Sequence, residues 1–208
     1  MSDKGRQLRV AVLISGSGRT LQNFIELSRA GQLPIEIVLV ISSRPDVAGV
    51  ERARRAAVPV EVIGRQGLSV EEFSRRVTEA IEAARVDLVL MAGWLCPWLI
   101  PPRYENRVMN IHPALLPKYG GKGFYGHHVH EAVLAAGDRE SGCTVHFANN
   151  EYDAGPIILQ RRVPVLPGDT PDTLADRVFQ QECIAYPEAI RLFAEGRLKV
   201  REGRVEIG

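Results

Sequence analysis

Short apolar runs and amphipathic stretches alternate through the first half of the chain. Runs rich in valine, isoleucine and leucine predict buried strands over residues 8–14, 35–41, 60–63 and 88–91. The stretches between them predict helices over 20–30, over 47–57 and from Ser69 onwards, because apolar residues recur there at helical spacing. Gly31 is expected to end the first helix and Ser69 to cap the third. This alternation is typical of right-handed βαβ crossovers and a mostly parallel sheet.

The second half of the chain is less regular. Its pattern predicts strands over 108–111, 144–147 and 157–165, and helices over 130–136 and from 171 or 173 to near Gly196. Pro187 is expected to kink or break the last helix, and residues 198–207 to form a hairpin around Glu202-Gly203. Because no repeat, low-complexity stretch or linker interrupts the chain, we expect one α/β domain over residues 1–208. Its fold should be Rossmann-like, an open, mostly parallel twisted sheet with helices on both faces.

Composition narrows the class of protein. The 208 residues include 26 Lys and Arg and 25 Asp and Glu, and this balance of charge argues against nucleic acid as a partner. The Arg52, Arg54 and Arg55 cluster is interpreted as a solvated helix face. Three cysteines without C-x-x-C spacing argue against a disulfide framework or a zinc ribbon and fit a reducing compartment. Met1–Gln7 has no apolar signal core and no run approaches membrane-spanning length, so we expect a cytoplasmic protein without a membrane partner.

A glycine-containing turn, Ser15-Gly16-Ser17-Gly18-Arg19-Thr20, joins the first predicted strand to the first helix. Glycines let the backbone approach an anion, and the free N–H groups at the start of a helix point at it. The turn lacks the lysine of a Walker loop and the third glycine of a dinucleotide fingerprint. It is therefore either a phosphate site at the carboxyl edge of the sheet or an ordinary strand-to-helix turn.

The end of the fifth predicted strand carries Asn110 and His112. Residues i and i+2 of a strand project to the same face, so two polar donors could meet there and stabilise an oxyanion. A structural histidine bonded to a backbone carbonyl is the equal alternative. Asp153 lies in a later polar loop and could pair with His112, raising the pKa of the imidazole. The alternative is a turn aspartate ahead of Gly155-Pro156.

Several longer motifs carry a resemblance to a known family. They are Leu13-Ile14-Ser15-Gly16-Ser17-Gly18, Met91-Ala92-Gly93, the run Asn110-Ile111-His112-Pro113-Ala114-Leu115-Leu116-Pro117-Lys118-Tyr119, Gly142-Cys143-Thr144-Val145-His146-Phe147, and Asp153-Ala154-Gly155-Pro156-Ile157-Ile158-Leu159-Gln160. Together they span nearly the whole chain. The sequence resembles the folate-dependent phosphoribosylglycinamide formyltransferases, the GAR transformylase family.

The resemblance implies an activity and its residues. The donor would be 10-formyltetrahydrofolate, and the acceptor the amine of 5'-phosphoribosylglycinamide in de novo purine (IMP) biosynthesis. Asn110 and protonated His112 would bind the oxyanion, with Asp153 keeping His112 charged and helping to move the proton. His146 matches a polar residue of the family's substrate pocket, and the Leu116–Pro117 bond is cis in relatives. The folate would contact Leu95, Cys96, Pro97, Trp98, Asn110, Asn149, Asn150, Glu151, Tyr152 and Asp153, and the nucleotide Gly18, Arg19, Thr20 and Glu182.

Two stretches depart from the family's pattern. Trp94-Leu95-Cys96-Pro97-Trp98 stands where the family has Phe-Met-Arg-Ile-Leu, and Val70 stands near an arginine that contacts folate in some relatives. The resemblance therefore implies weaker cationic contacts to folate in this chain. The loop over residues 120–130 is long and carries His127, His128 and His130. These histidines raise the alternative of a metal site. We expect no metal and interpret the loop, with its glycine hinges, as one that positions substrate.

Other activities remain open from the sequence. A formyltransferase for an amino-sugar nucleotide or an aminoacylated tRNA, and a hydrolase that releases formate from the same folate, would share these motifs. The tRNA enzyme is expected to carry a basic C-terminal domain and the hydrolase an N-terminal regulatory domain. A non-catalytic nucleotide-binding module would explain the glycine turn but not Asn110 and His112. Both a monomer and a homodimer fit the sequence.

Overall fold

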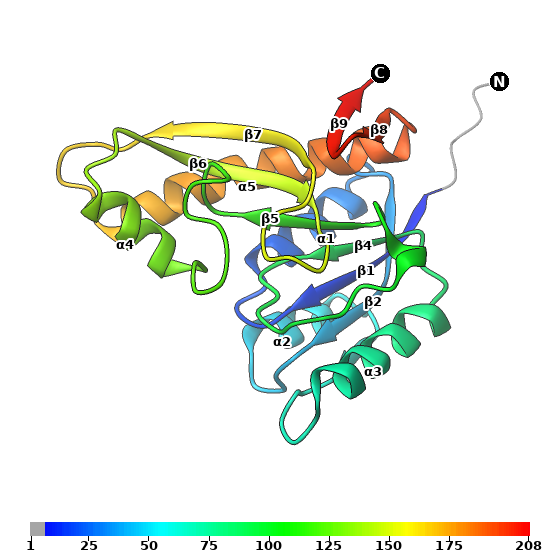
Figure 1. The fold of residues 1–208 in the computed structure, drawn as a ribbon. Coiled ribbons are helices and arrows are strands. Elements are labelled where there is room, and N and C mark those ends of the chain that lie inside the picture. The colour runs from blue at the N-terminus through cyan, green and yellow to red at the C-terminus, as the bar shows by residue number, and fades with distance from the viewer. Residues whose placement is uncertain (1–6) are drawn as a thin grey trace. The chain divides into compact units, whose positions relative to one another are not determined.

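A computed structural model describes residues 7–208 (Figure 1). Residues 1–6, and with them most of the segment predicted to lack a signal core, lie outside the described residues. The chain divides into two compact units on either side of the Val108–Met109 bond.

The first unit contains a four-stranded parallel sheet. Its strands follow the order β3-β2-β1-β4, and every neighbouring pair is parallel. They are β1 (Leu8–Ile14), β2 (Ile35–Ser42), β3 (Val60–Val62) and β4 (Leu88–Met91). All four predicted strands are therefore confirmed. The centre of the sheet is apolar throughout, because residues 10–14 of β1 and 88–90 of β4 are fully buried.

Helices cover both faces of this sheet. They are α1 (Arg19–Arg29), α2 (Ala48–Arg55) and α3 (Val70–Ala83), followed by the short 3₁₀ helix η1 (Pro102–Tyr104). The chain moves outwards from β1 to β3 and then crosses back to β4, so right-handed crossovers put α1 and α2 on one face and α3 on the other, as Figure 1 shows. The predicted ends are confirmed: Gly31, with φ of 69°, follows α1, and the Ser69 hydroxyl accepts from the N–H of Glu72 at 3.1 Å.

The second unit contains antiparallel strands and two helices. Strand β5 (Val108–His112) pairs with β6 (Glu140–Phe147), which pairs with β7 (Ile157–Pro164). Helices α4 (His127–Ala135) and α5 (Pro171–Ala194) and the hairpin β8 (Leu198–Arg201)–β9 (Arg204–Ile207) complete it. The predicted hairpin is confirmed. Two predicted starts were late, since α4 begins at His127 rather than 130 and β6 at Glu140 rather than 144.

Helix α5 runs through Pro187 as one 24-residue helix, so the expected break does not occur. Its start is fixed by a capping box between Thr170 and Thr173 with Pro171 at the first turn. Tyr186 is fully buried, and its hydroxyl donates to the carbonyl of Met109 at 2.8 Å. Packing against β6 and β7 therefore outweighs the hydrogen bond that the proline removes.

The fold class predicted from the sequence is confirmed. Parallel strands with helices on both faces, extended by antiparallel strands, form an α/β fold. None of the helices within residues 7–208 combines the length and the apolar composition that a membrane crossing needs.

Candidate active site

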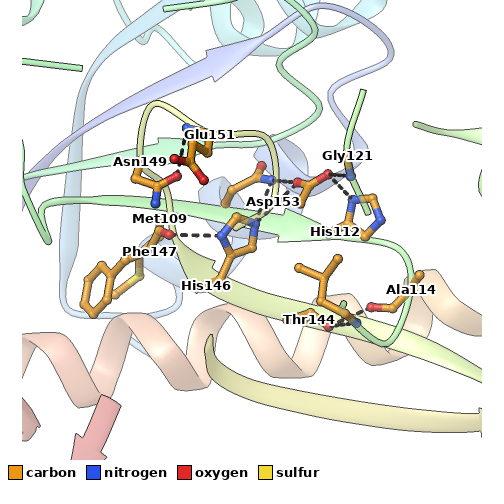
Figure 2. Close-up of polar contacts among 12 residues, drawn as sticks. Met109, His112, Ala114, Gly121, Thr144, His146, Phe147, Asn149, Glu151 and Asp153 are labelled. Carbon is orange, nitrogen blue, oxygen red and sulfur yellow. Dashed lines mark hydrogen bonds and ion pairs between the residues drawn. The ribbon is translucent and has the colours of Figure 1, made fainter. Parts of the chain in front are cut away.

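Polar side chains of the second unit converge on the carboxylate of Asp153 (Figure 2). Its Oδ2 lies 3.5 Å from Nδ1 of His112, and its Oδ1 accepts from the amide of Asn110 at 3.5 Å. Nε2 of His146 lies 3.6 Å from the same Oδ1 and 3.2 Å from the Asn110 amide nitrogen. The structure therefore brings the three predicted catalytic residues together and adds His146 to them.

Strand register explains this convergence. Asn110 and His112 stand two residues apart on β5 and project to one face, as the spacing predicted. In the antiparallel pairing with β6, Asn110 lies opposite His146 and His112 lies opposite Thr144. Directly opposed residues have neighbouring side chains, so β6 supplies the fourth polar group of the cluster.

The loop between β6 and β7 carries Asp153 and is closed at its base. The N–H of Phe147 donates to the carbonyl of Pro156 at 2.9 Å, and a Cβ on Gly155 would lie 1.8 Å from the Phe147 carbonyl oxygen. Asp153 has φ of 54°, a left-handed conformation that aspartate tolerates better than most residues. Its Oδ2 also accepts from the N–H of Gly121 at 3.0 Å. Asp153 is thus a turn residue whose side chain points to the cluster.

Burial and charge act in opposite directions on the ionisation of this cluster. His112 is 4% exposed, and burial lowers the pKa of its imidazole more than the charge of Asp153 raises it. The expected raised pKa of His112 is therefore wrong in its net direction, although the contribution of Asp153 has the expected sign. Burial raises the pKa of Asp153, but the hydrogen bond from His146 and the charge of His112 bring it below its usual value. Asp153 is therefore a carboxylate near neutral pH.

Thr144 organises the chain that follows β5. Its buried hydroxyl donates to the carbonyl of Ala114 at 2.6 Å and accepts from the N–H of Leu116 at 3.0 Å and the amide of Gln160 at 2.9 Å. The Leu116–Pro117 bond is cis, as the resemblance implied. One side chain of β6 therefore fixes the path of the backbone from His112 towards the glycine-rich loop.

In the first unit, the glycine turn and the segment after β4 lie at the same edge of the sheet. The N–H of Ser15 donates to the carbonyl of Gly93 at 3.0 Å, and the Ser15 hydroxyl accepts from Leu95 N–H at 3.0 Å and from the Ser43 hydroxyl at 2.7 Å. Strand order reverses between β1 and β4. Ligands of open α/β sheets bind outside the carboxyl ends of strands at such a point. Residues 18–20, predicted to contact the nucleotide, and residues 95–98, predicted to contact the folate, therefore lie at the same edge of the sheet.

The turn itself is held by α2. Gly18 is the N-cap of α1 with φ of 68°, and a Cβ on it would lie 2.6 Å from Cα of Gly49. Nε of Arg52 donates to the carbonyl of Ser17 at 3.0 Å. The sequence predicted a solvated face for Arg52, and no pattern in it marks this contact, because the acceptor is a backbone carbonyl. Arg54 and Arg55 are exposed, as predicted.

The predicted folate wall has an exposed and a buried part. Leu95 is 57% exposed, whereas Trp98 is 5% exposed and donates its Nε1–H to the Thr78 hydroxyl at 3.0 Å. Cys96 and Pro97 are half-buried, and Val70 is the first residue of α3. The ring of Trp98 therefore packs inside the unit, and Leu95 presents the apolar surface.

In the second unit, residues 149–152 at the tip of the β6–β7 loop are exposed, with Tyr152 at 59%. The N–H of Glu151 donates to the Asn149 side chain at 3.0 Å. Glu182 lies half-buried on α5, where its charge contributes to raising the pKa of Cys143 after the larger effect of burial. These predicted contacts of folate and nucleotide lie on elements of the unit that holds Asp153.

The three histidines of the long loop do not converge on one point: two pair with different carboxylates and the third is buried. His127 pairs with Asp172 at 2.7 Å and His128 with Glu131 at 3.1 Å. His130 is 4% exposed, and burial, with smaller contributions from His127 and His112, lowers its pKa to about 4. Within residues 7–208, no three His, Cys, Asp or Glu side chains are grouped so as to hold a metal ion.

Known proteins are similar to this chain over nearly its whole length. The sequence profile described as formyl transferase matches residues 8–190. A phosphoribosylglycinamide formyltransferase of Haemophilus influenzae is 38% identical over 93% of this chain and 91% of its own length. The trifunctional purine biosynthetic protein adenosine-3 of Drosophila melanogaster is 42% identical, but the chain spans only 14% of its length. The crystal structure of glycinamide ribonucleotide transformylase 1 from Symbiobacterium toebii has a TM-score of 0.91 at 42% identity, covering 100% of this chain and 97% of that one.

Proposed function

The chain belongs to the formyl transferase family, and on that premise we propose that it formylates the amine of 5'-phosphoribosylglycinamide, using 10-formyltetrahydrofolate as donor. This reaction is a step of de novo purine (IMP) biosynthesis. The names of the relatives that match nearly the whole chain support the acceptor. The observation that carries the proposal is the convergence of Asn110, His112 and His146 on one carboxylate, Asp153.

The cluster suits the transfer of a formyl group between two nitrogens. The acceptor amine forms a bond to the formyl carbon, and the formyl oxygen becomes an oxyanion in a tetrahedral intermediate. The amide of Asn110 and an N–H of protonated His112 donate to that oxygen. The intermediate then breaks its bond to N10 of the folate, while the proton lost by the amine reaches N10. Asp153 accepts and returns this proton, directly or through water.

Ionisation of the cluster fits these roles. Burial keeps the pKa of His112 below its usual value, so the neutral ring is favoured until a negative charge develops beside it. Asp153 is ionised near neutral pH because its pKa is lowered, and its charge favours the imidazolium. A developing oxyanion adds a second negative charge next to His112. The cluster is therefore arranged to bind a proton on His112 as the transition state forms.

The first unit supplies an anion site for the nucleotide. Gly18 is the N-cap of α1, and Arg19 and Thr20 are the first two residues of the helix, where backbone N–H groups point towards the helix end. This arrangement suits the 5'-phosphate of the acceptor, because both the helix dipole and Arg19 favour negative charge. Glu182 on α5 would contact the same acceptor, as the resemblance implies.

The folate contacts that the resemblance implies lie on two elements, the segment after β4 in the first unit and the β6–β7 loop in the second. Leu95, Cys96 and Pro97 offer apolar contacts without the arginine that the family usually has there. Asn149, Asn150, Glu151 and Tyr152 are exposed at the loop tip. Backbone N–H and C=O groups of these segments suit the amide-like edge of a pterin. We propose no metal ion, and only small-molecule partners.

A direct assay tests the proposal. Purified protein is mixed with 10-formyltetrahydrofolate with and without 5'-phosphoribosylglycinamide, and the deformylated folate and the formylated nucleotide are both quantified. Equal amounts of the two products, formed only when the acceptor is present, are expected. Release of formate at the same rate without acceptor would identify a hydrolase instead. Turnover with an amino-sugar nucleotide but not with the glycinamide would identify a different acceptor.

A further inference from the structure

Both ring nitrogens of His112 face an acceptor, at different distances. Nε2 lies 2.7 Å from the backbone carbonyl oxygen of Tyr119, and Nδ1 lies 3.5 Å from Oδ2 of Asp153. A neutral imidazole has one N–H to donate. A distance of 2.7 Å is at the strong end of the range for hydrogen bonds from nitrogen, whereas 3.5 Å is at its limit. The carbonyl therefore competes better than the carboxylate for the single proton.

The side chain of Tyr119 holds this carbonyl in place. Tyr119 has φ of 58°, a left-handed conformation that is uncommon for a residue with a bulky side chain. Its hydroxyl donates to Oδ2 of Asp138 at 2.7 Å. Nζ of Lys118 bonds both oxygens of the same carboxylate and lies 4.9 Å from the centre of the Tyr119 ring. The direction of the carbonyl thus depends on an anchor at Asp138, which precedes β6.

We infer that Tyr119, anchored by Asp138, fixes neutral His112 as its Nε2–H tautomer and reserves Nδ1, beside Asp153, for the proton that His112 gains and loses. Tyr119 and Asp138 are positioning residues in this role. The inference deepens the proposed function and rests on it for the chemistry, although the tautomer itself can be measured without substrate.

The reserved nitrogen has a chemical consequence. Nδ1 of the neutral ring presents a lone pair towards the carboxylate, which repels it, and becomes an N–H donor when the ring is protonated. The oxyanion donor would then be Nδ1–H, on the side of Asn110, while Nε2–H never leaves Tyr119. The other titratable groups that act on His112 are His146 of β6 and His130 of α4. Within residues 7–208 the ring nitrogens of His112 contact Tyr119 and Asp153 rather than these two histidines, which therefore change the charge balance of His112 but do not select its tautomer.

Nitrogen-15 NMR of the full, substrate-free chain tests the tautomer. The ring nitrogens of His112 are assigned by their absence in His112→Gln and followed across a pH titration. At high pH we expect a pyrrole-type signal for Nε2 and a pyridine-type signal for Nδ1. A pyrrole-type Nδ1 would mean that Asp153 selects the tautomer and would overturn the inference, whatever the enzyme's acceptor proves to be.

Two substitutions test the anchor. Tyr119→Phe removes the hydroxyl bond to Asp138, and Asp138→Asn weakens it. Each should shift the His112 signals towards those of a mixture of tautomers, and lower kcat roughly two- to tenfold, the value of one hydrogen bond. Loosening the carbonyl bond also removes a contact that favours the imidazolium. The basic limb of the kcat profile should therefore move to lower pH.

Glu140→Gln is the matched control. This exposed residue lies two positions after Asp138 and pairs with Arg162, so its change to an amide should leave the His112 signals and the pH profile as they were. If Tyr119→Phe and Asp138→Asn lower only the melting temperature and leave the tautomer unchanged, the anchor is structural and the inference fails. If the tautomer responds but the wild-type protein does not formylate the glycinamide nucleotide, the proposed function fails alone.

Discussion

Oδ2 of Asp153, in the loop between β6 and β7, lies 3.5 Å from Nδ1 of His112, the last residue of β5. The other oxygen of the same carboxylate accepts from Asn110 at 3.5 Å. One carboxylate therefore contacts both residues that we propose as donors to the oxyanion. Its removal should disturb the charge of one donor and the orientation of the other.

Asp153→Asn should lower kcat by about 10²–10⁴-fold, the range of general acid–base catalysis, with a smaller change in KM. The amide keeps the size of the side chain but can neither favour the imidazolium nor accept a proton. Steady-state rates and circular dichroism of both proteins check this. Asp46→Asn, in an exposed pair with Arg44, is the control and should retain its rate. An Asp153→Asn rate within threefold of wild type would exclude Asp153 from the mechanism.

Thr144→Val should reduce the free energy of unfolding by about 1–3 kcal/mol, because it leaves the Leu116 N–H and the Ala114 carbonyl without their buried partner. Denaturant unfolding measures this change. Ser141→Ala is the matched control on the same strand. The Ser141 hydroxyl is buried with no hydrogen-bond partner among residues 7–208, so its loss should change the stability by much less. Equal losses in the two variants would contradict the role given to Thr144.

His130 should make the folded chain less stable in acid. Its pKa is lowered from 6.5 to about 4, so between these values the unfolded chain binds the proton and the folded chain does not. The contribution of His130 to stability is therefore fully present above pH 6.5 and is lost as the pH is lowered towards 4, by at most about 1.4 kcal/mol per pH unit. His130→Phe should flatten this dependence between pH 4 and 6.5 in unfolding experiments. His112 and the acidic groups remain in both proteins, so an unchanged slope would show that His130 is not the source.

Gly49→Ala should raise the KM for the nucleotide more than the KM for the folate. A Cβ there would lie 2.6 Å from the Ile14 side chain and 2.9 Å from the Gly16 carbonyl oxygen, so α2 must move away from the glycine turn. Overpacking of this kind costs about 1–3 kcal/mol of stability. Gly16→Ala, whose Cβ would have nothing within 4 Å, serves as the stability control. Equal stability of the two variants would show that α2 gives way without strain.

The spacing of apolar residues predicted helices and strands well where the burial of one face is enough to determine the element. The strands of the first unit and the caps at Ser69 and Gly31 follow from local pattern and from the chemistry of helix ends. Pro187 does not break α5, because the effect of a proline depends on tertiary packing, which here keeps the helix continuous. The start of α4 was predicted too late because three of its first four residues are histidines, which carry little helical signal.

The sequence predicted which residues form the catalytic cluster better than it predicted their pKa shifts. Spacing placed Asn110 and His112 on one face, and the family motif pointed to Asp153. The sign of the net pKa shift of His112 depends on how deeply the ring is buried, which no spacing reports. The link from Arg52 to the glycine turn and the bond from His112 to Tyr119 are contacts of backbone carbonyls. Every residue has such a carbonyl, so sequence gives no sign of them.

The tip and the closed base of the β6–β7 loop should differ in the substitutions that they tolerate. At the tip, residues 149–152 are exposed, and substitutions or insertions there would alter what the loop contacts without moving its ends. At the base, the Gly155 backbone lies so close to the Phe147 carbonyl that even a methyl group cannot enter, and Asp153 is two residues away. Directed evolution of this protein towards a different formyl donor therefore has room at the tip of the loop, while the catalytic carboxylate stays where the base holds it.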